Sequence, residues 1–278
     1  MKTIIMGAAD RPGVWDAFQK LRPEIEKYAE IVATDFHWCQ DMSQVDSDIA
    51  IVFGGDGSVL RSAHSMRENQ RPVLAVNLGT LGFMTNIQTE NLLEVLHSLR
   101  LDDLKTVKHL MLECQIHKGA GSQPPETWLC LNEVVVFHKE GGFHIVNISL
   151  AVDHLPVTTF RCDGLILSTP FGSTGHSLSA GGPILRKDLD AVVITPISPH
   201  SLNQRPVVDS ADRTYEIRTD GCCGKVLIDG MDVTTITPDD RVTVRRASVS
   251  FQMLDLPGHG YYATLRDKLG WSGNIIDD

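Results

Sequence analysis

Short apolar runs and longer amphipathic stretches alternate along the first hundred residues of the chain. The apolar runs have the length of strands and the amphipathic stretches have helical spacing, which predicts a β-α alternation. Residues 49–53 are apolar at every position, as is typical of a strand buried on both faces of a parallel sheet. The predicted strands are 3–8, 30–34, 49–53 and 72–77, and the predicted helices are 14–28, 58–66 and 91–99.

From about Lys105 onward, apolar residues recur at every second position instead. Residues 146–153 show this alternation most clearly, and it predicts half-buried antiparallel strands. Turn residues such as Asp229-Gly230 separate the stretches, and helical spacing returns at residues 260–271. Further strands are predicted at 128–138, 165–168, 191–195, 214–218, 225–228 and 241–253.

These patterns predict an α/β fold followed by an all-β fold. We expect a Rossmann-like domain with a parallel sheet at residues 1–103 and a β-rich domain at residues 104–253. The C-terminal segment, residues 254–278, is predicted to place a helix back on the first domain. Residues 118–127 are rich in Gly, Ser and Pro, which favours an exposed loop.

Composition excludes several classes of protein. The formal net charge of −10 argues against binding to a nucleic-acid backbone, which requires a positive surface. No window approaches the roughly 20 apolar residues of a membrane span, and the N-terminal apolar run is too short for a secretory signal, so we expect a soluble protein without membrane partners. The six cysteines are scattered without C-x-x-C spacing, which favours reduced thiols in the cytoplasm. The histidines show no zinc-ligand spacing.

A glycine-bracketed aspartate follows the predicted strand 49–53. Gly54, Gly55 and Gly57 surround Asp56 where a helix begins, so backbone N–H groups in this turn could cradle a phosphate. Asp56 could then accept a proton or bind a metal ion. The same four residues are also consistent with a plain strand-to-helix turn in which Asp56 caps the helix.

A second glycine cluster, Asn77-Leu78-Gly79-Thr80-Leu81-Gly82-Phe83, follows the next predicted strand. Because the carboxyl ends of parallel strands lie at one edge of a sheet, both glycine turns are expected to face the same crevice. The alternative is an ordinary loop with Phe83 in the core.

Two further motifs lie in the β-rich half. Asn132 and Glu133 open an otherwise apolar strand, and an amide next to a carboxylate can hydrogen-bond a pair of sugar hydroxyls. Taken alone, an Asn-Glu pair at a strand edge is usually just solvated. Residues 161–183 concentrate glycine, serine and threonine after an apolar strand, the composition needed where a helix start approaches a flat ligand closely.

Together these motifs resemble the NAD kinase family, whose members use ATP or polyphosphate. The similarity spans nearly the whole chain in the family's order, and it includes the P-x-S-P-H-S-L-x-x-R-P run at 196–206 and the ending L-R-D-K-L-G-W. The G-G-D-G element is shared with diacylglycerol and sphingosine kinases and with 6-phosphofructokinases. The Asn-Glu pair and D-G-L-I-x-S-T-P-x-G-S-T-x-x-x-L-S-A-G-G-P-I are far more specific.

The resemblance implies that Asp56 is the base that accepts the proton of the adenosine 2′-hydroxyl of NAD. Gly54, Gly55 and Gly57 would hold the phosphates of ATP or another donor, assisted by magnesium. The product would be NADP. Family members are dimers or tetramers, so the resemblance also implies a homodimer or homotetramer.

The resemblance further implies where NAD binds. Asn132 and Glu133 would grip the adenosine ribose, Phe83 would pack against the adenine, and Asp163 would lie at the nicotinamide end. Arg161 could offset pyrophosphate charge or form a structural ion pair. The segment that resembles the adenine pocket supplies Thr174, Gly175, His176 and Ser179, with Ser177 and Leu178 between them.

The chain departs from the family pattern at two positions, with Phe171 in place of a threonine and His176 in place of a tyrosine. Histidine has a smaller ring and a pH-dependent charge, which bears on the affinity for NAD and the preference between NAD and NADH. The departures leave open a kinase-like NAD(P)-binding sensor with weak or no turnover. The third hypothesis, a kinase that phosphorylates a lipid or a sugar, is supported by the G-G-D-G motif alone.

Overall fold

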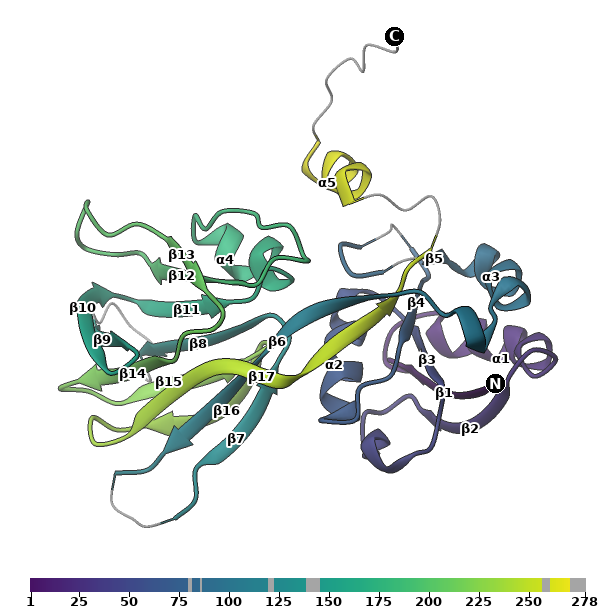
Figure 1. Cartoon of the computed structure of the whole chain (residues 1–278), viewed down its shortest axis with the longest axis horizontal. Coiled ribbons are helices and arrows are strands. Elements are labelled where there is room, and N and C mark those ends of the chain that lie inside the picture. Colours follow the sequence, from purple (N-terminus) through teal and green to yellow (C-terminus); the bar gives the residue numbers. More distant parts are fainter. Residues whose placement is uncertain (80–81, 86, 120–122, 139–145, 257–260, 271–278) are drawn as a thin grey trace, which may run out of the picture. The chain divides into compact units, whose positions relative to one another are not determined.

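The computed structural model of the chain describes residues 1–79, 82–85, 87–119, 123–138, 146–256 and 261–270 (Figure 1). The chain divides into two compact units. The first, called here the α/β unit, contains Met1–Lys108 and Phe251–Asp278, and the second, the β unit, contains His109–Ser250.

The α/β unit contains a parallel sheet, as predicted. Its strands run in the order β2-β1-β3-β4, and both β5 and the end of β17 pair with β4. Every residue of β3 and β4 is buried, which explains why β3 is apolar throughout and β4 is apolar up to its last residue, Asn77. The bounds are β1 Lys2–Gly7, β2 Glu30–Asp35, β3 Ile49–Phe53, β4 Val73–Asn77, β5 Ile87–Gln88 and β17 Arg241–Leu254.

Helices cover both faces of this sheet (Figure 1). Phe18 of α1 and Leu96 of α3 share one core cluster with Ile5, Ile51 and Leu74 of the strands. Helix α2 packs on the opposite face, where it contacts β1 and β3. The bounds are α1 Val14–Ile25, α2 Asp56–Met66, α3 Leu92–Ser98 and α5 Tyr261–Leu269, with short turns η1 Met42–Gln44, η2 Thr89–Asn91 and η3 Leu101–Asp103.

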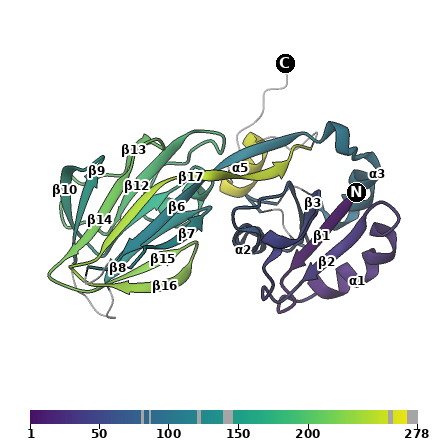
Figure 2. The same ribbon diagram turned by 60° about the horizontal axis from the view of Figure 1, so that its bottom comes forward.

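The β unit contains two antiparallel sheets (Figure 2). One follows the order β10-β9-β14-β17, continued by β6 and β7, and the other is six-stranded with the order β13-β12-β11-β8-β15-β16. The bounds are β6 Thr106–His117, β7 Glu126–Cys130, β8 Glu133–His138, β9 Val146–Val152, β10 Leu155–Cys162, β11 Gly164–Ser168, β12 Ala191–Ile197, β13 Val207–Ser210, β14 Tyr215–Asp220, β15 Gly224–Ile228 and β16 Met231–Ile236.

The core of the β unit lies between these two sheets. Ile148 of β9 and Ile217 of β14 share one buried cluster with Val136 of β8 and Leu167 of β11. Two short helical turns, η4 Gly172–Thr174 and α4 His176–Ser179, follow β11. The predicted combination of a parallel α/β fold with a β-rich fold and a C-terminal helix is therefore confirmed.

Several details differ from the sequence prediction. The strand predicted at residues 128–138 is two strands, β7 and β8, interrupted at Leu131 and Asn132. The sequence pattern predicts no strand at β5, β6, β10, β13 or β16. In β10 the alternation is hidden because Leu155 and Val157 are exposed although they are apolar. The predicted loop 118–127 ends early, since β7 begins at Glu126. Residues 80–81, 120–122, 260 and 271, which carried parts of other predictions, lie outside the described residues.

Candidate active site

The first glycine loop connects β3 to α2. Gly54 has a φ of 138°, and a Cβ atom there would lie 2.2 Å from Oγ of Ser58, so only glycine fits. The Gly54 N–H donates to the carbonyl of Val76 at 2.9 Å, which ties the loop to β4. Cβ atoms at Gly55 and Gly57 would meet nothing within 4 Å. The start of α2 therefore has open space beside its backbone, where a phosphate could approach the N–H groups.

Asp56 is the first residue of α2, and its carboxylate contacts the second glycine loop. Oδ2 accepts a hydrogen bond from the backbone N–H of Phe83 at 3.1 Å, and Oδ1 accepts one from Met84 at 2.9 Å. The carboxylate thus links two loops instead of capping its own helix. Each oxygen keeps a second lone pair for another partner.

The second loop is shaped to receive this carboxylate. A Cβ atom at Gly82 would lie 2.1 Å from Oδ1 of Asp56, so glycine is required for the contact. The Thr85 hydroxyl accepts from the Gly82 N–H at 2.8 Å and from the Asn77 side-chain amide at 3.3 Å. Asn77 in turn accepts from the Gly79 N–H at 3.0 Å. The two glycine loops therefore lie together at one sheet edge, and Phe83 is half-buried there.

In the β unit, Asn132 lies between β7 and β8 and Glu133 is the first residue of β8, and each is only 7% exposed. Among the described residues, neither Oδ1 of Asn132 nor Oε2 of Glu133 has a hydrogen-bond partner, although both atoms are buried. Burial, and then the charge of Asp229, raise the pKa of Glu133 to about 8. Buried polar atoms of this kind are normally paired, which marks them as candidates for ligand contacts.

Asp229 was predicted only as a turn residue, yet it organises this site. Its carboxylate accepts backbone hydrogen bonds from Leu131 at 2.8 Å, Asn132 at 2.7 Å and Glu133 at 3.0 Å. The Asp229 N–H donates back to the Glu133 carbonyl at 3.0 Å. Because the N–H groups of Leu131 and Asn132 turn toward Asp229, they do not join a strand ladder, which explains the break between β7 and β8.

The glycine- and serine-rich loop after β11 lies against Asn132. The Thr169 hydroxyl donates to the Leu131 carbonyl at 2.6 Å, and the Thr169 N–H donates to the Asn132 carbonyl at 2.8 Å. A Cβ atom at Gly172 would lie 2.4 Å from the Asn132 backbone. A Cβ atom at Gly175 would lie 3.6 Å from Oε2 of Glu133. The structure therefore brings the Asn-Glu pair and this loop together.

The remaining predicted residues of the loop differ in exposure. His176 and Ser179 are exposed, whereas Thr174 and Leu178 are half-buried. Ser177 is buried, and its hydroxyl forms a 2.9 Å hydrogen bond with the Thr195 hydroxyl. Ser177 therefore fixes α4 on β12, while its neighbours present the surface of the loop.

Phe171, Asp163 and Arg161 lie around this loop. Phe171 is buried, and its ring centroid lies 4.7 Å from that of His109, with the Lys187 ammonium 5.1 Å from the Phe171 ring. Asp163 is exposed just before β11, and Arg161 is exposed on β10. Phe171 thus anchors the base of the loop in the core.

The described residues contain no group of three or more His, Cys, Asp or Glu side chains that could hold a metal ion. A divalent cation at Asp56 would therefore need ligands from a bound phosphate. None of the helices within the described ranges is long and apolar enough to cross a membrane. All six cysteines are free thiols.

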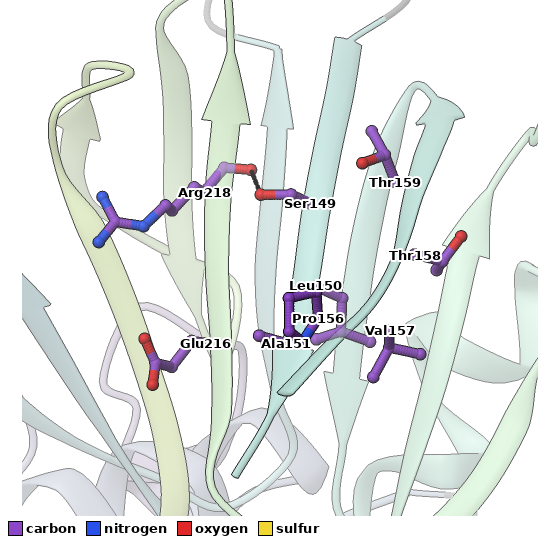
Figure 3. Close-up of a pocket in the computed structure, with 9 residues that line it drawn as sticks. All are labelled: Ser149, Leu150, Ala151, Pro156, Val157, Thr158, Thr159, Glu216 and Arg218. Carbon is purple, nitrogen blue, oxygen red and sulfur yellow. Dashed lines mark hydrogen bonds between the residues drawn. The ribbon is translucent and has the colours of Figure 1, made fainter. Parts of the chain in front are cut away.

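A groove on the β unit lies over β9 and β10 (Figure 3). Within it the Ser149 hydroxyl donates to the backbone carbonyl of Arg218 at 3.5 Å. The groove contains none of the predicted site residues. Its lining is Ser149, Leu150, Ala151, Pro156, Val157, Thr158, Thr159, Glu216 and Arg218.

Sequence comparison matches two domain families. The ATP-NAD kinase N-terminal domain matches residues 19–103, and the ATP-NAD kinase C-terminal domain matches residues 131–256. The NAD kinase of Rhodopirellula baltica is 44% identical over 276 residues, which cover 99% of this chain and 88% of the relative. The NAD kinase of Gemmatimonas aurantiaca is 39% identical over 228 residues, covering 81% and 78%.

Two solved structures share the fold. The crystal structure of yeast NADH kinase complexed with NADH has a TM-score of 0.88 and 22% identity, covering 100% of this chain and 90% of that chain. The crystal structure of an NAD kinase from Archaeoglobus fulgidus in complex with ATP has a TM-score of 0.77 and 23% identity, covering 98% and 100%.

Proposed function

Since the chain belongs to the NAD kinase family, it phosphorylates the adenosine 2′-hydroxyl of NAD to give NADP, and we propose that Asp56 is the base of this reaction. The observation that carries the proposal is the orientation of its carboxylate, which two backbone N–H groups hold from the second glycine loop. A secondary alcohol is a weak nucleophile at neutral pH, so a fixed proton acceptor is needed. Asp56 accepts the hydroxyl proton as the 2′-oxygen attacks the terminal phosphorus and the donor's leaving group departs.

The donor phosphates bind at the start of α2. Gly54, Gly55 and Gly57 supply the backbone there, and the open space beside Gly55 and Gly57 supports this assignment. Mg²⁺ is bound in proteins by one or two carboxylates together with substrate phosphates, and Asp56 has lone pairs suited to one such contact. When bound, magnesium neutralises phosphate charge that develops during transfer.

The acceptor's adenosine binds in the β unit. The unpaired oxygens of Asn132 and Glu133 accept hydrogen bonds from the ribose hydroxyls, which would satisfy two buried polar atoms at once. Gly175 leaves room beside Glu133 for the sugar. The exposed ring of His176 stacks on the adenine.

The outer contacts to NAD are assigned from the resemblance and from exposure. Thr174, Leu178 and Ser179 line the pocket with His176, and Phe83 packs on the adenine. Asp163 and Arg161 are exposed and reach the nicotinamide and the pyrophosphate, respectively.

The test compares Asp56→Asn with the wild type in an assay that contains NAD, ATP and magnesium. NADP is measured with an NADP-dependent dehydrogenase. We expect turnover to fall roughly 100-fold or more, while NAD still raises the melting temperature of the variant. Asp16→Asn, at an exposed aspartate in α1, serves as the control and keeps its activity. Turnover of Asp56→Asn within a few fold of wild type would remove Asp56 from the base role.

The enzyme is also proposed to act in the cytoplasm as a homodimer or homotetramer. Two strands at the ends of their sheets carry exposed apolar side chains: Leu155 and Val157 on β10 are 71% and 57% exposed, and Val207 on β13 is 54% exposed. Strand edges with such side chains favour pairing with another chain. Light scattering after size exclusion should give a multiple of 30.6 kDa for the wild type and a smaller species for Val157→Lys.

A further inference from the structure

We propose that Asp229 is a positioning residue for the acceptor: its carboxylate holds residues 131–133 in the conformation that presents Asn132 and Glu133 to the ribose. The inference rests on the proposed role of these two residues in NAD binding. Asp229 itself contacts their backbone and no reacting atom, so it acts through them.

The geometry is that of a single anion binding three consecutive backbone N–H groups. The donor–acceptor distances of the three hydrogen bonds are 2.7 to 3.0 Å, although the partners are 96 to 98 residues apart in the sequence. Hydrogen bonds to an ionised group are stronger than those between neutral groups. The reciprocal bond from the Asp229 N–H to the Glu133 carbonyl closes the contact. The turn at 131–133 therefore depends on a distant side chain, not on its own sequence.

Asp229 is held in place by its own turn. Asp229 and Gly230 have φ values of 50° and 80°, and they form the two-residue connection between β15 and β16, where Ile228 pairs with Met231. Two left-handed residues in succession define a turn that favours Asp-Gly or Asn-Gly. Because asparagine tolerates this conformation equally well, Asp229→Asn changes the charge without straining the backbone.

The hairpin is also docked directly beside the site. Ile228, the residue before Asp229, pairs with Val134, the residue after Glu133. A shift of the hairpin would therefore move the acceptor residues with it. In Asp229→Asn one carboxylate oxygen becomes an NH₂ group, which faces backbone donors and cannot accept from them. At least one of the three N–H groups then loses its partner.

The negative charge of Asp229 also raises the pKa of Glu133. Burial is the main cause of the raised pKa of Glu133 and the Asp229 charge is the second. Among the described residues, Cys130 is a further titratable group beside them. Its thiol donates to Asp229 at 3.3 Å, and burial raises its pKa well above the ordinary value, so it stays neutral. Removing the Asp229 charge should therefore lower the pKa of Glu133.

The experiment measures kcat and the two KM values of the intact enzyme between pH 6 and 9. For Asp229→Asn we expect the KM for NAD to rise about tenfold or more, while the KM for ATP stays within about twofold. The ionised form of Glu133 accepts from the ribose hydroxyls, so the KM for NAD falls with rising pH and levels off above the pKa of Glu133. In the variant this plateau begins at a lower pH. Asp232→Asn, which breaks only an exposed ion pair to Lys225, should change none of these values.

Three outcomes would overturn the inference. An unchanged KM for NAD would show that Asp229 does not position the site. Equal rises in both KM values with an unshifted pH profile would reduce Asp229 to a structural residue. If the variant does not fold, the test is amide hydrogen exchange of the wild type. Exchange of the amides of residues 131–133 as fast as in an open loop would exclude the three hydrogen bonds to Asp229.

The proposed function is tested separately by Asn132→Ala. If that variant leaves the KM for NAD unchanged, the acceptor site itself is misplaced. If it raises the KM while Asp229→Asn does not, only the positioning role fails.

Discussion

Replacing Glu133 by glutamine is expected to stabilise the protein while weakening its binding of NAD. The unfolded chain ionises this carboxyl at a pKa of 4.5, whereas burial, with the nearby charge of Asp229, keeps it protonated in the folded protein up to about pH 8. Below pH 4.5 this carboxyl is protonated in both the folded and the unfolded protein, and the free energy of unfolding has its full value. The free energy of unfolding falls as the pH rises from 4.5 to about 8, because over this range the unfolded chain releases the proton while the folded protein still holds it.

The size of the effect follows from the two pKa values. One pKa unit corresponds to about 1.4 kcal/mol, so at pH 7 the buried carboxyl lowers the free energy of unfolding by up to about 3 kcal/mol. Glutamine has the shape of the neutral acid and no proton to lose. Glu133→Gln should then raise the melting temperature by roughly 6 to 12 °C at pH 7 and by nothing below pH 4.5.

The assay is thermal or urea unfolding of the wild type and the variant without NAD, at several pH values from 4 to 9. The matched control is Glu126→Gln, at an exposed glutamate of β7, which should change little. The variant should also show a KM for NAD about tenfold higher, because an amide accepts fewer hydroxyl hydrogen bonds than a carboxylate. If the stability difference between wild type and variant does not grow with pH, Glu133 is not buried as an uncharged acid and the reasoning fails.

Three other substitutions test further contacts. Gly82→Ala places a methyl group against the Asp56 carboxylate, so kcat should fall roughly 100-fold while NAD-induced thermal stabilisation persists; activity near wild type would contradict the loop contact. Burial lowers the pKa of His109 to about 4, so the free energy of unfolding should fall by up to about 3 kcal/mol as the pH falls from 6.5 to 4. In His109→Leu the melting temperature should depend less on pH over this range. His176→Tyr should tighten NAD binding in calorimetry, and unchanged affinity would show that this side chain points away from the ligand.

The parallel sheet and its two glycine loops could be predicted from the sequence because their causes are local. A strand buried on both faces must be apolar at every position, as residues 49–53 are. Glycine is needed where the backbone has a positive φ, as at Gly54, and where a loop closely approaches another chain segment, as at Gly82. The contact between the loops follows from the rule that parallel strands end at one sheet edge.

The β unit was harder to predict because its pattern depends on contacts between distant segments. The break at Leu131 and Asn132 is caused by Asp229, and no sequence pattern between these residues predicts that contact. Exposed apolar residues such as Leu155 hid the alternation of β10. The candidate roles of Asn132 and Glu133 came from the family resemblance, since an Asn-Glu pair alone is usually just a solvated strand edge.

The connectivity of the two units bears on how the protein is made. His109–Ser250 is one continuous stretch inserted within the α/β unit, and the chain crosses between the units inside β6 and β17. During synthesis the β unit is complete once residue 250 has left the ribosome, whereas β4, which pairs with β3 and β5, gains Met253 of β17 as a further partner only later. We therefore expect the inserted half to reach its native state first, and a fragment ending near residue 108 to expose an edge of its sheet and aggregate.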